Sequence, residues 1–339
     1  MNTDALGLLQ AIYTEPLDPL PRLIYADWLE EHAAPVHAAL VRYQARQGEP
    51  ASPPKGWLDR LREDAPCPLQ LGLSDGLLLH MRVKRELTNN PRLVTRLVNW
   101  MNRHHIHGVA LGDRPNLGWW FNLPLWSATV RLELSQVGLN EGNMIMLMQS
   151  SHLRNLLDLD LSFTQMTENS LRRLLGQERW HHLRALDLSG LRLPEWFWPL
   201  FVRWPVMQRL ARLRLRDVNW QPYALEAIRD GPSLPHLREL MIGPLEPGVE
   251  ILCQWTTLPG LQSLSLYYPR LLRVDRLLTA RWWPQLRFLA ILEQTLDDSI
   301  LALAEGLPPL CRLLIPREGV SEARAASLER RLERRLEWA

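Results

Sequence analysis

The residues best suited to binding a metal ion are histidines that lie close together in the chain. His104, His105 and His107 form the densest group, and in an extended segment alternate side chains share one face. A zinc site draws on three or four histidine, cysteine or carboxylate ligands, and no cysteine or carboxylate cluster accompanies these histidines. The pair His181 and His182 has the same limitation. We therefore expect no metal site and no cofactor.

Other catalytic patterns are missing from the sequence. It contains no phosphate-binding glycine loop, no helix with paired zinc-binding histidines and no nucleophile elbow. Cys67 lies between two prolines, with no adjacent base to activate its thiol. Asp27 and Glu30 fit a solvated or ion-paired helix face better than a catalytic carboxylate pair. Catalysis would need residues that come together only in the folded chain. We expect a protein that is not an enzyme and has no small-molecule substrate.

The composition narrows the class of protein. The chain has 339 residues, of which 71 are leucine, and its 39 basic and 37 acidic residues give a net charge of +2. No whole-chain field therefore attracts it to nucleic acid or to an anionic membrane. Charges or prolines interrupt every apolar run before it reaches a membrane-spanning length, and the first residues lack an export signal. The three cysteines are far apart, as expected of thiols in a reducing compartment. We expect a cytoplasmic protein with no membrane contact.

The leucines recur with a fixed period. The pattern LxxLxL, with isoleucine at some last positions, begins at residues 156, 183, 210, 237, 261, 286 and 310. Successive copies start 24 to 27 residues apart, and two degraded copies precede them. Between the copies, apolar residues such as Leu171, Leu174 and Leu175 follow helical spacing. Each repeat is therefore predicted to form a short strand followed by a helix. The chain as a whole is predicted to have an α/β fold.

Two of these copies carry a family resemblance. The segments LDLDLSFTQM (157–166) and LRALDLSGLRL (183–193) resemble the strand consensus of the leucine-rich-repeat family, in its ribonuclease-inhibitor-like subclass. The resemblance covers residues 105–320, or about nine repeats. It implies a solenoid in the form of a horseshoe, with parallel strands on the concave face and helices on the convex face. The asparagine that usually follows the strand is replaced here, so the backbone groups of that turn need other partners.

Three segments lie outside the repeats. Residues 1–47 predict three helices, and PRLIYADWLEEH (21–32) resembles the repeat-companion domain, a small all-α domain at the start of many bacterial leucine-rich-repeat proteins. Residues 48–104 predict a linker, rich in proline at its start, and a transition into the repeats. Residues 321–339 predict an amphipathic helix that caps the last repeat, and a partner-binding helix is the alternative.

The family resemblance also implies where a ligand binds. Residues between the conserved leucines point outward from the concave face, and here they change along the chain from carboxylates through an arginine strip to aromatic side chains. Charges that orient a partner and aromatic or arginine anchors are what a protein-recognition face needs. The alternative is that any solenoid strand must carry polar residues on its open face. The predicted partner-binding residues are Glu133, Asp158, Asp160, Asp187, Arg212, Arg214, Arg216, Glu239, Tyr267, Tyr268 and Phe288.

These observations lead to a functional hypothesis. We expect a non-catalytic protein-interaction module, a receptor, adaptor or scaffold, that binds another protein encoded nearby. An inhibitor or regulatory subunit of a partner enzyme is the alternative. A nucleic-acid-binding solenoid is a weaker third hypothesis, because carboxylates at Asp158, Asp160, Asp187 and Glu239 would oppose phosphate contacts by the arginines.

Overall fold

The computed structural model describes residues 3–47, 56–67, 70–74, 78–83, 91–111, 121, 124–244, 250–267, 274–292, 298–318 and 320–339. The chain divides into two compact units, Met1–Leu186 and Asp187–Ala339. Both contain parallel strands that alternate with helices. The α/β class expected from the repeat period is confirmed.

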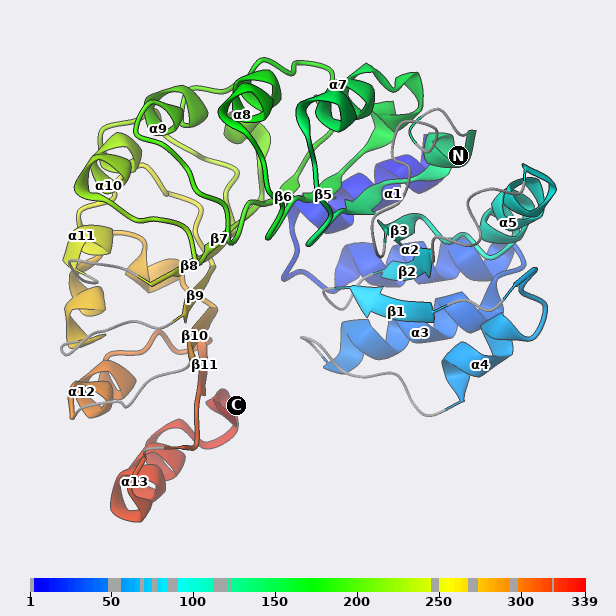
Figure 1. Ribbon diagram of the computed structural model, residues 1–339. Helices are drawn as coiled ribbons and strands as arrows, with labels where there is room; N and C mark the ends of the chain where they lie inside the picture. Colours follow the sequence, from blue (N-terminus) through cyan, green and yellow to red (C-terminus); the bar gives the residue numbers. More distant parts are fainter. Residues whose placement is uncertain are drawn as a thin grey trace. The chain divides into compact units, whose positions relative to one another are not determined.

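The first compact unit begins with helices (Figure 1). The three helices expected in residues 1–47 are present, and a fourth follows them. Apolar residues at helical spacing bury one side of each of the first two helices, for example Leu9 and Ile12, which are both fully buried. The helices are α1 (Thr3–Thr14), α2 (Leu20–Glu31), α3 (Pro35–Gln47) and α4 (Trp57–Arg62).

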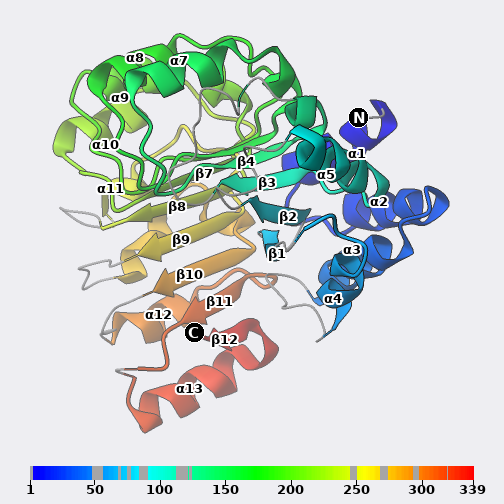
Figure 2. The same cartoon turned by 45° about the vertical axis from the view of Figure 1, so that its right-hand side comes forward.

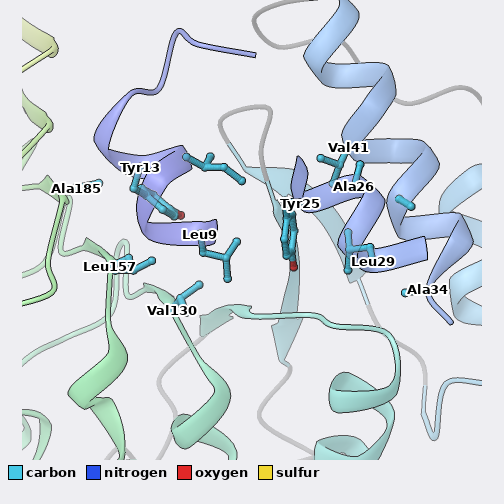
Figure 3. Packing of buried hydrophobic residues seen from close by; sticks show 12 residues of the cluster. Leu9, Tyr13, Tyr25, Ala26, Leu29, Ala34, Val41, Val130, Leu157 and Ala185 are labelled. Atoms are coloured by element: carbon cyan, nitrogen blue, oxygen red, sulfur yellow. The ribbon is translucent and has the colours of Figure 1, made fainter. Parts of the chain in front are cut away.

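The helical core of residues 3–47 is shared with the strands of the same unit (Figure 3). Leu9 of α1 and Tyr25 of α2 belong to one buried cluster with Val130, Leu157 and Ala185. These last three residues lie at the beginnings of consecutive strands. A fully buried leucine or valine contributes roughly 1.5–3 kcal/mol relative to an exposed one. The helices therefore form one compact body with the first repeats.

The strands of the first compact unit are short and mostly parallel. The first two form an antiparallel pair, and each later strand pairs in parallel with the one before it. The strands are β1 (Gln70–Ser74), β2 (Leu78–Val83), β3 (Gly108–Leu111), β4 (Arg131–Glu133) and β5 (Asp158–Asp160), and the boundary between the units falls within β6 (Ala185–Asp187). The helices between them are α5 (Pro91–Arg103), η2 (Pro124–Ala128), α7 (Glu141–Gln149), η3 (Ser151–Asn155) and α8 (Glu168–Leu175).

Polar side chains begin two of these helices. Asn140 accepts a hydrogen bond from the backbone N–H of Asn143, and Thr167 accepts one from that of Ser170. Such N-caps satisfy backbone donors that the first helical turn leaves unpaired. The two caps fix the residues at which α7 and α8 begin.

In the second compact unit every strand pairs in parallel with its neighbour from β7 to β12. Figures 1 and 2 show α10, α11 and α12 on one side of β8 to β11. The strands are β7 (Arg212–Arg216), β8 (Glu239–Gly243), β9 (Ser263–Tyr267), β10 (Phe288–Leu292), β11 (Arg312–Ile315) and β12 (Leu336–Trp338). The helices are α9 (Phe197–Phe201), η4 (Met207–Arg209), α10 (Pro222–Arg229), α11 (Glu250–Cys253), η5 (Val274–Thr279), η6 (Trp283–Gln285), α12 (Ser299–Glu305), α13 (Glu322–Leu332) and η7 (Glu333–Arg335).

The leucines of the repeat pattern are the core. Leu213 and Leu215 of β7 are 2% and 0% exposed, and the corresponding Leu264 and Leu266 of β9 are each 1% exposed. Because side chains alternate along a strand, the residues between them point to the opposite face. The leucine period of the sequence thus predicts which face of each strand is buried in the core, and the opposite face is the one that could carry a binding site.

The C-terminal segment differs from the expected helix over residues 321–339. Ser321 caps α13 as expected, and Leu328 and Leu332 are buried. At Glu333 the backbone turns into a left-handed conformation, with φ of 49°, and the helix ends at Leu332. The chain then forms β12, which pairs with β11 and so satisfies backbone groups that the edge of β11 would otherwise expose. The prediction of one helix over residues 321–339 is therefore wrong: the helix ends at Leu332, and Leu336–Trp338 form a strand.

Candidate interaction surface

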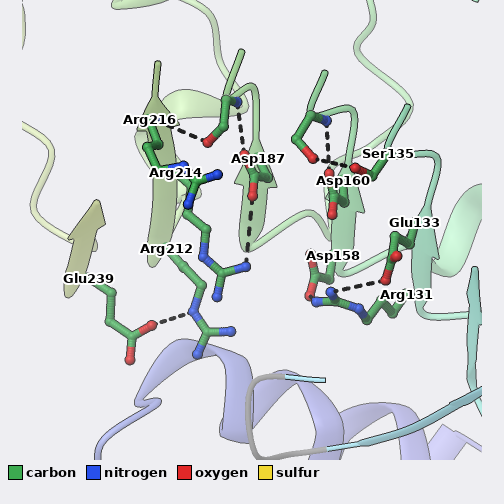
Figure 4. A network of polar contacts seen from close by, with 12 residues as sticks. Arg131, Glu133, Ser135, Asp158, Asp160, Asp187, Arg212, Arg214, Arg216 and Glu239 are labelled. Atoms are coloured by element: carbon green, nitrogen blue, oxygen red, sulfur yellow. Dashed lines mark hydrogen bonds and ion pairs between the residues drawn. The ribbon is translucent and has the colours of Figure 1, made fainter. Parts of the chain in front are cut away.

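The first predicted binding residues form a buried ion-pair network on β4 and β5 (Figure 4). The Arg131 guanidinium contacts the carboxylate of Asp158, and it lies 3.7 Å from that of Glu133. The side chains of Arg131 and Asp158 are only 5% and 4% exposed. The hydroxyl of Tyr13 donates a hydrogen bond of 3.2 Å to the same Asp158 carboxylate. Asp158 therefore links α1 to the strands of the first compact unit.

Asp160 organises the turn after β5. Its carboxylate accepts a 2.8 Å hydrogen bond from the backbone N–H of Ser162, and the Ser162 hydroxyl donates to that of Ser135 at 2.9 Å. Burial raises the pKa of the Asp160 carboxyl, while the hydrogen bonds from Ser162 and the charge of Arg131 act in the opposite direction. The turn after β5 lacks the usual asparagine, and the Asp160 carboxylate supplies part of its hydrogen bonding instead.

The predicted exposure of this acidic region is wrong. Asp158 and Asp160 are 3% and 8% exposed, and both make hydrogen bonds within the first compact unit. The alternation rule places them on the face opposite the leucines, but Tyr13 and the turn after β5 use their carboxylates internally. Glu133 retains partial exposure beside Arg131.

The second compact unit carries charged and aromatic residues on the strand face opposite its leucines, and all but Arg212 are partly exposed. Strand register aligns Arg212 with Glu239, and Phe288 with Arg312. These residues occupy equivalent positions and face away from the buried leucines. We call this set the second-unit strand face and define it as Asp187, Arg212, Arg214, Arg216, Glu239, Tyr267, Phe288, Arg312 and Glu337.

Arg212 and Glu239 form a largely buried ion pair on this face. The Arg212 guanidinium donates to the Glu239 carboxylate on the adjacent strand, and the two side chains are 4% and 13% exposed. Arg214 lies 3.9 Å from Asp187, whose carboxylate also accepts a 2.8 Å hydrogen bond from the backbone N–H of Ser189. The predicted exposure of Arg212 is therefore wrong, and its charge is matched by Glu239.

Arg216 and Tyr267 meet across β8, where the intervening residue is Gly243. Arg216 is in register with Gly243, and the Arg216 guanidinium lies 5.0 Å from the centre of the Tyr267 ring. Gly243 has φ of 144°, and a Cβ at this position would overlap the Tyr267 carbonyl group. A guanidinium at this distance from an aromatic ring makes a favourable cation–π contact.

A second arginine–aromatic pair lies on β10 and β11. The Arg312 guanidinium is 5.6 Å from the centre of the Phe288 ring and 2.8 Å from the Glu337 carboxylate of β12. The side chain of Arg312 is 33% exposed. Arg312 was considered from the sequence only as a possible phosphate contact of a nucleic-acid-binding solenoid. It is absent from the predicted partner-binding residues, although it occupies the same repeat position as Phe288. Glu337 was missed because its segment was expected to be helical. Tyr268, the remaining predicted site residue, lies outside the described residues.

The histidines near residue 105 pack between helices and strands of the first compact unit. The ring of Trp28 stacks on His32 at 4.0 Å between centres and meets the edge of His105 at 4.9 Å. His104 donates a hydrogen bond from Nε2 to the Asp64 carboxylate at 3.0 Å. Over the described part of the chain, no group of three or more histidine, cysteine, aspartate or glutamate residues is arranged to hold a metal ion.

Two other histidines are fully buried in the neutral form. His37 donates from Nδ1 to the His104 carbonyl at 3.1 Å, and His107 donates from Nδ1 to the Ala128 carbonyl at 2.9 Å. Burial is the main cause that lowers the pKa of His37 to about 3 and that of His107 to about 4. Among the described residues, neither Nε2 atom has a hydrogen-bond partner.

Burial raises the pKa of two cysteine thiols, those of Cys67 and Cys311. Burial raises the pKa of Cys311 to about 12, against smaller opposite effects of Arg335 and Arg312. Burial also raises the pKa of Cys67, the thiol between two prolines. A thiolate is the reactive form of cysteine, so both environments disfavour nucleophilic chemistry.

No helix within the described ranges combines the length and the apolar composition needed to cross a membrane. Comparison with models of known protein families finds no match to this sequence. A search of curated proteins likewise finds no match.

Proposed function

We propose that this chain is a leucine-rich-repeat solenoid that binds a protein partner through the second-unit strand face and performs no catalysis itself. The buried in-phase leucines and the parallel strand ladder support the solenoid assignment. Helices packed with the first strands support a repeat-companion module in residues 1–47. Three cysteines without disulfides support a reducing compartment such as the cytoplasm.

The observation that carries the binding proposal is the pair of arginine–aromatic contacts on that face. Arg216 with Tyr267 and Arg312 with Phe288 combine a cation and an aromatic ring at 5.0 and 5.6 Å. All four residues are partly exposed. Arginine and tyrosine are enriched among residues that dominate binding energy in protein interfaces. Ring contact also orders each arginine before a partner arrives, which reduces the entropy lost on binding.

Carboxylates beside the arginines favour a protein over a nucleic acid. Arg212, Arg214 and Arg312 each lie within 4 Å of an aspartate or glutamate carboxylate. Phosphate binding gains affinity by neutralising charge with cations, and adjacent carboxylates weaken that gain. Mixed charges with aromatic anchors suit a protein surface of complementary charge.

The proposal is tested by charge reversal at the two exposed anchors. The full chain should capture one stoichiometric protein from its native cell extract, and the purified partner should bind in calorimetric titration. Arg216→Glu/Arg312→Glu should weaken that binding by about 30-fold, equivalent to about 2 kcal/mol for loss of interface anchors.

The matched control is Arg203→Glu/Arg209→Glu, which makes the same change of charge at exposed arginines elsewhere in the second compact unit. The control should bind like the original chain. Equal binding by both double variants would show that the second-unit strand face is not the partner site.

A further inference from the structure

A hollow of about 350 Å³ lies in the first compact unit, apart from the residues discussed above. It opens between η3, which precedes β5, and the connection that precedes β6. Met148, Leu153 and Trp180 supply apolar lining. A volume of this size falls within the roughly 300–1,000 Å³ of small-molecule sites.

The repeat pattern explains why space is left here. Leu153 lies 27 residues after Trp126 and 27 residues before Trp180, so the three occupy the same position in consecutive repeats. All three side chains are buried: Trp126 is 0% exposed, Leu153 1% and Trp180 2%. A leucine is smaller than the tryptophans on either side, and the unfilled volume lies beside Leu153 and Trp180.

The charged side chains that line the hollow are both arginines. Arg154 and Arg179 lie there with the neutral hydroxyls of Ser150 and Ser151 and the ring of His181, and no described carboxylate lines it. Within the described ranges, neither Arg154 nor Arg179 makes an ion pair, and Arg154 donates from Nε to the Ser151 carbonyl at 3.1 Å. By contrast, Arg173 of α8 is paired with Glu141 at 3.1 Å. The two arginines at the hollow therefore keep their charge available for an anion.

We propose that this hollow binds a small organic acid, a carboxylate attached to an aromatic or short alkyl body. Guanidinium groups bind carboxylates through charge-assisted and often bidentate hydrogen bonds. Arg154 and Arg179 supply those donors, while Leu153 and Trp180 remove the apolar body from water. This binding site goes beyond the proposed protein interaction and adds a ligand class that the sequence does not indicate.

Calorimetric titration of the full chain with 4-phenylbutyrate and its neutral amide, 4-phenylbutyramide, tests the proposal. The acid should bind at least about 10-fold more tightly than the amide, because a hydrogen bond to a charged group is the stronger one. Arg154→Gln/Arg179→Gln should reduce affinity for the acid by about 10-fold to 100-fold. Ser151→Trp, which places a large side chain into the hollow from its rim, should abolish binding of both compounds.

The matched control is Arg46→Gln/Arg192→Gln, which removes two exposed arginines outside the hollow. It should bind the acid normally, and circular dichroism should show that every variant is folded. Equal affinity for acid and amide, unchanged binding by Arg154→Gln/Arg179→Gln, or no heat of binding at millimolar ligand would each overturn the proposal.

Discussion

Asp158 joins three parts of the first compact unit at a single carboxylate. It pairs with Arg131 on the adjacent strand and accepts a hydrogen bond from Tyr13 of α1. We expect Asp158→Asn to lower the free energy of unfolding by about 3–5 kcal/mol. The buried Arg131 guanidinium then loses the carboxylate that it contacts and keeps only that of Glu133, at 3.7 Å. Guanidinium chloride denaturation followed by circular dichroism measures the change.

A double replacement separates charge from packing at this position. Arg131→Met/Asp158→Leu removes both charges and keeps apolar volume, so it should lose less stability than Asp158→Asn alone. A greater loss in the double variant, or a loss below about 1 kcal/mol in Asp158→Asn, would contradict the assigned role of the ion pair.

The same residue shows which part of the site could be predicted from sequence. Strand alternation correctly placed Asp158, Asp160 and Arg212 on the face opposite the leucines. It could not predict their burial, because that depends on partners outside the strand. Tyr13 is 145 positions from Asp158, and the Glu239 partner of Arg212 is 27 positions away. The alternation of residues along a strand predicts which face a side chain occupies. Whether that face is exposed depends on the tertiary structure.

At the scale of an element, β8 depends on its final glycine. Gly243 has φ of 144°, and a Cβ there would overlap the Tyr267 carbonyl group of β9. We expect Gly243→Ala to lower the free energy of unfolding by at least about 1–3 kcal/mol, the cost of holding a side-chain-bearing residue in such a conformation. Urea denaturation measures the effect.

Gly138→Ala is the matched control for this prediction. A Cβ at Gly138 would meet no atom within 4 Å, and its φ is not positive. Its effect should stay within about 0.5 kcal/mol, as for most exposed positions. Equal losses in the two alanine variants would show that the close approach of β8 to β9 carries no particular strain.

The C-terminal strand shows where element prediction failed. Leu328, Leu332 and Leu336 follow a four-residue spacing that fits a helix, while Leu336–Trp338 also alternates apolar and polar residues as a strand does. Three residues are too few to tell a helical period from a strand period. The residues form a strand because they pair with β11, whose edge would otherwise leave backbone groups without hydrogen bonds. That edge exists only once the preceding strands are assembled.

At the scale of the whole molecule, the histidines are unevenly distributed. Nine of the ten lie in Met1–Leu186, and His236 alone belongs to Asp187–Ala339. Burial lowers the pKa of His37 to about 3 and that of His107 to about 4, and it also lowers the pKa of His105 and His182. The sequence locates these histidines, but their burial follows from helix packing.

The sign of the resulting pH dependence follows from proton binding. An unfolded histidine has a pKa of about 6.5, so below that pH the unfolded chain binds protons that buried His37 and His107 exclude. Their contribution to stability is complete above about pH 7 and decreases toward pH 4. Between pH 7 and pH 5 each of these two histidines should lower the free energy of unfolding by about 2 kcal/mol. The raised pKa of Asp160 acts in the opposite direction, because the native carboxyl holds its proton more tightly.

We therefore expect mild acid to loosen the first compact unit before the second. Hydrogen–deuterium exchange at pH 7 and pH 5, corrected for intrinsic exchange rates, should show protection in α2, α3 and β3 falling by about 1,000-fold for a combined loss of about 4 kcal/mol. Protection in β7 to β11 should change little, because pH 5 lies above the ordinary pKa of carboxylates, about 4. A His37→Gln/His107→Gln variant should lose most of this pH dependence. Equal loss of protection in both compact units would instead assign the acid response to groups other than these two histidines.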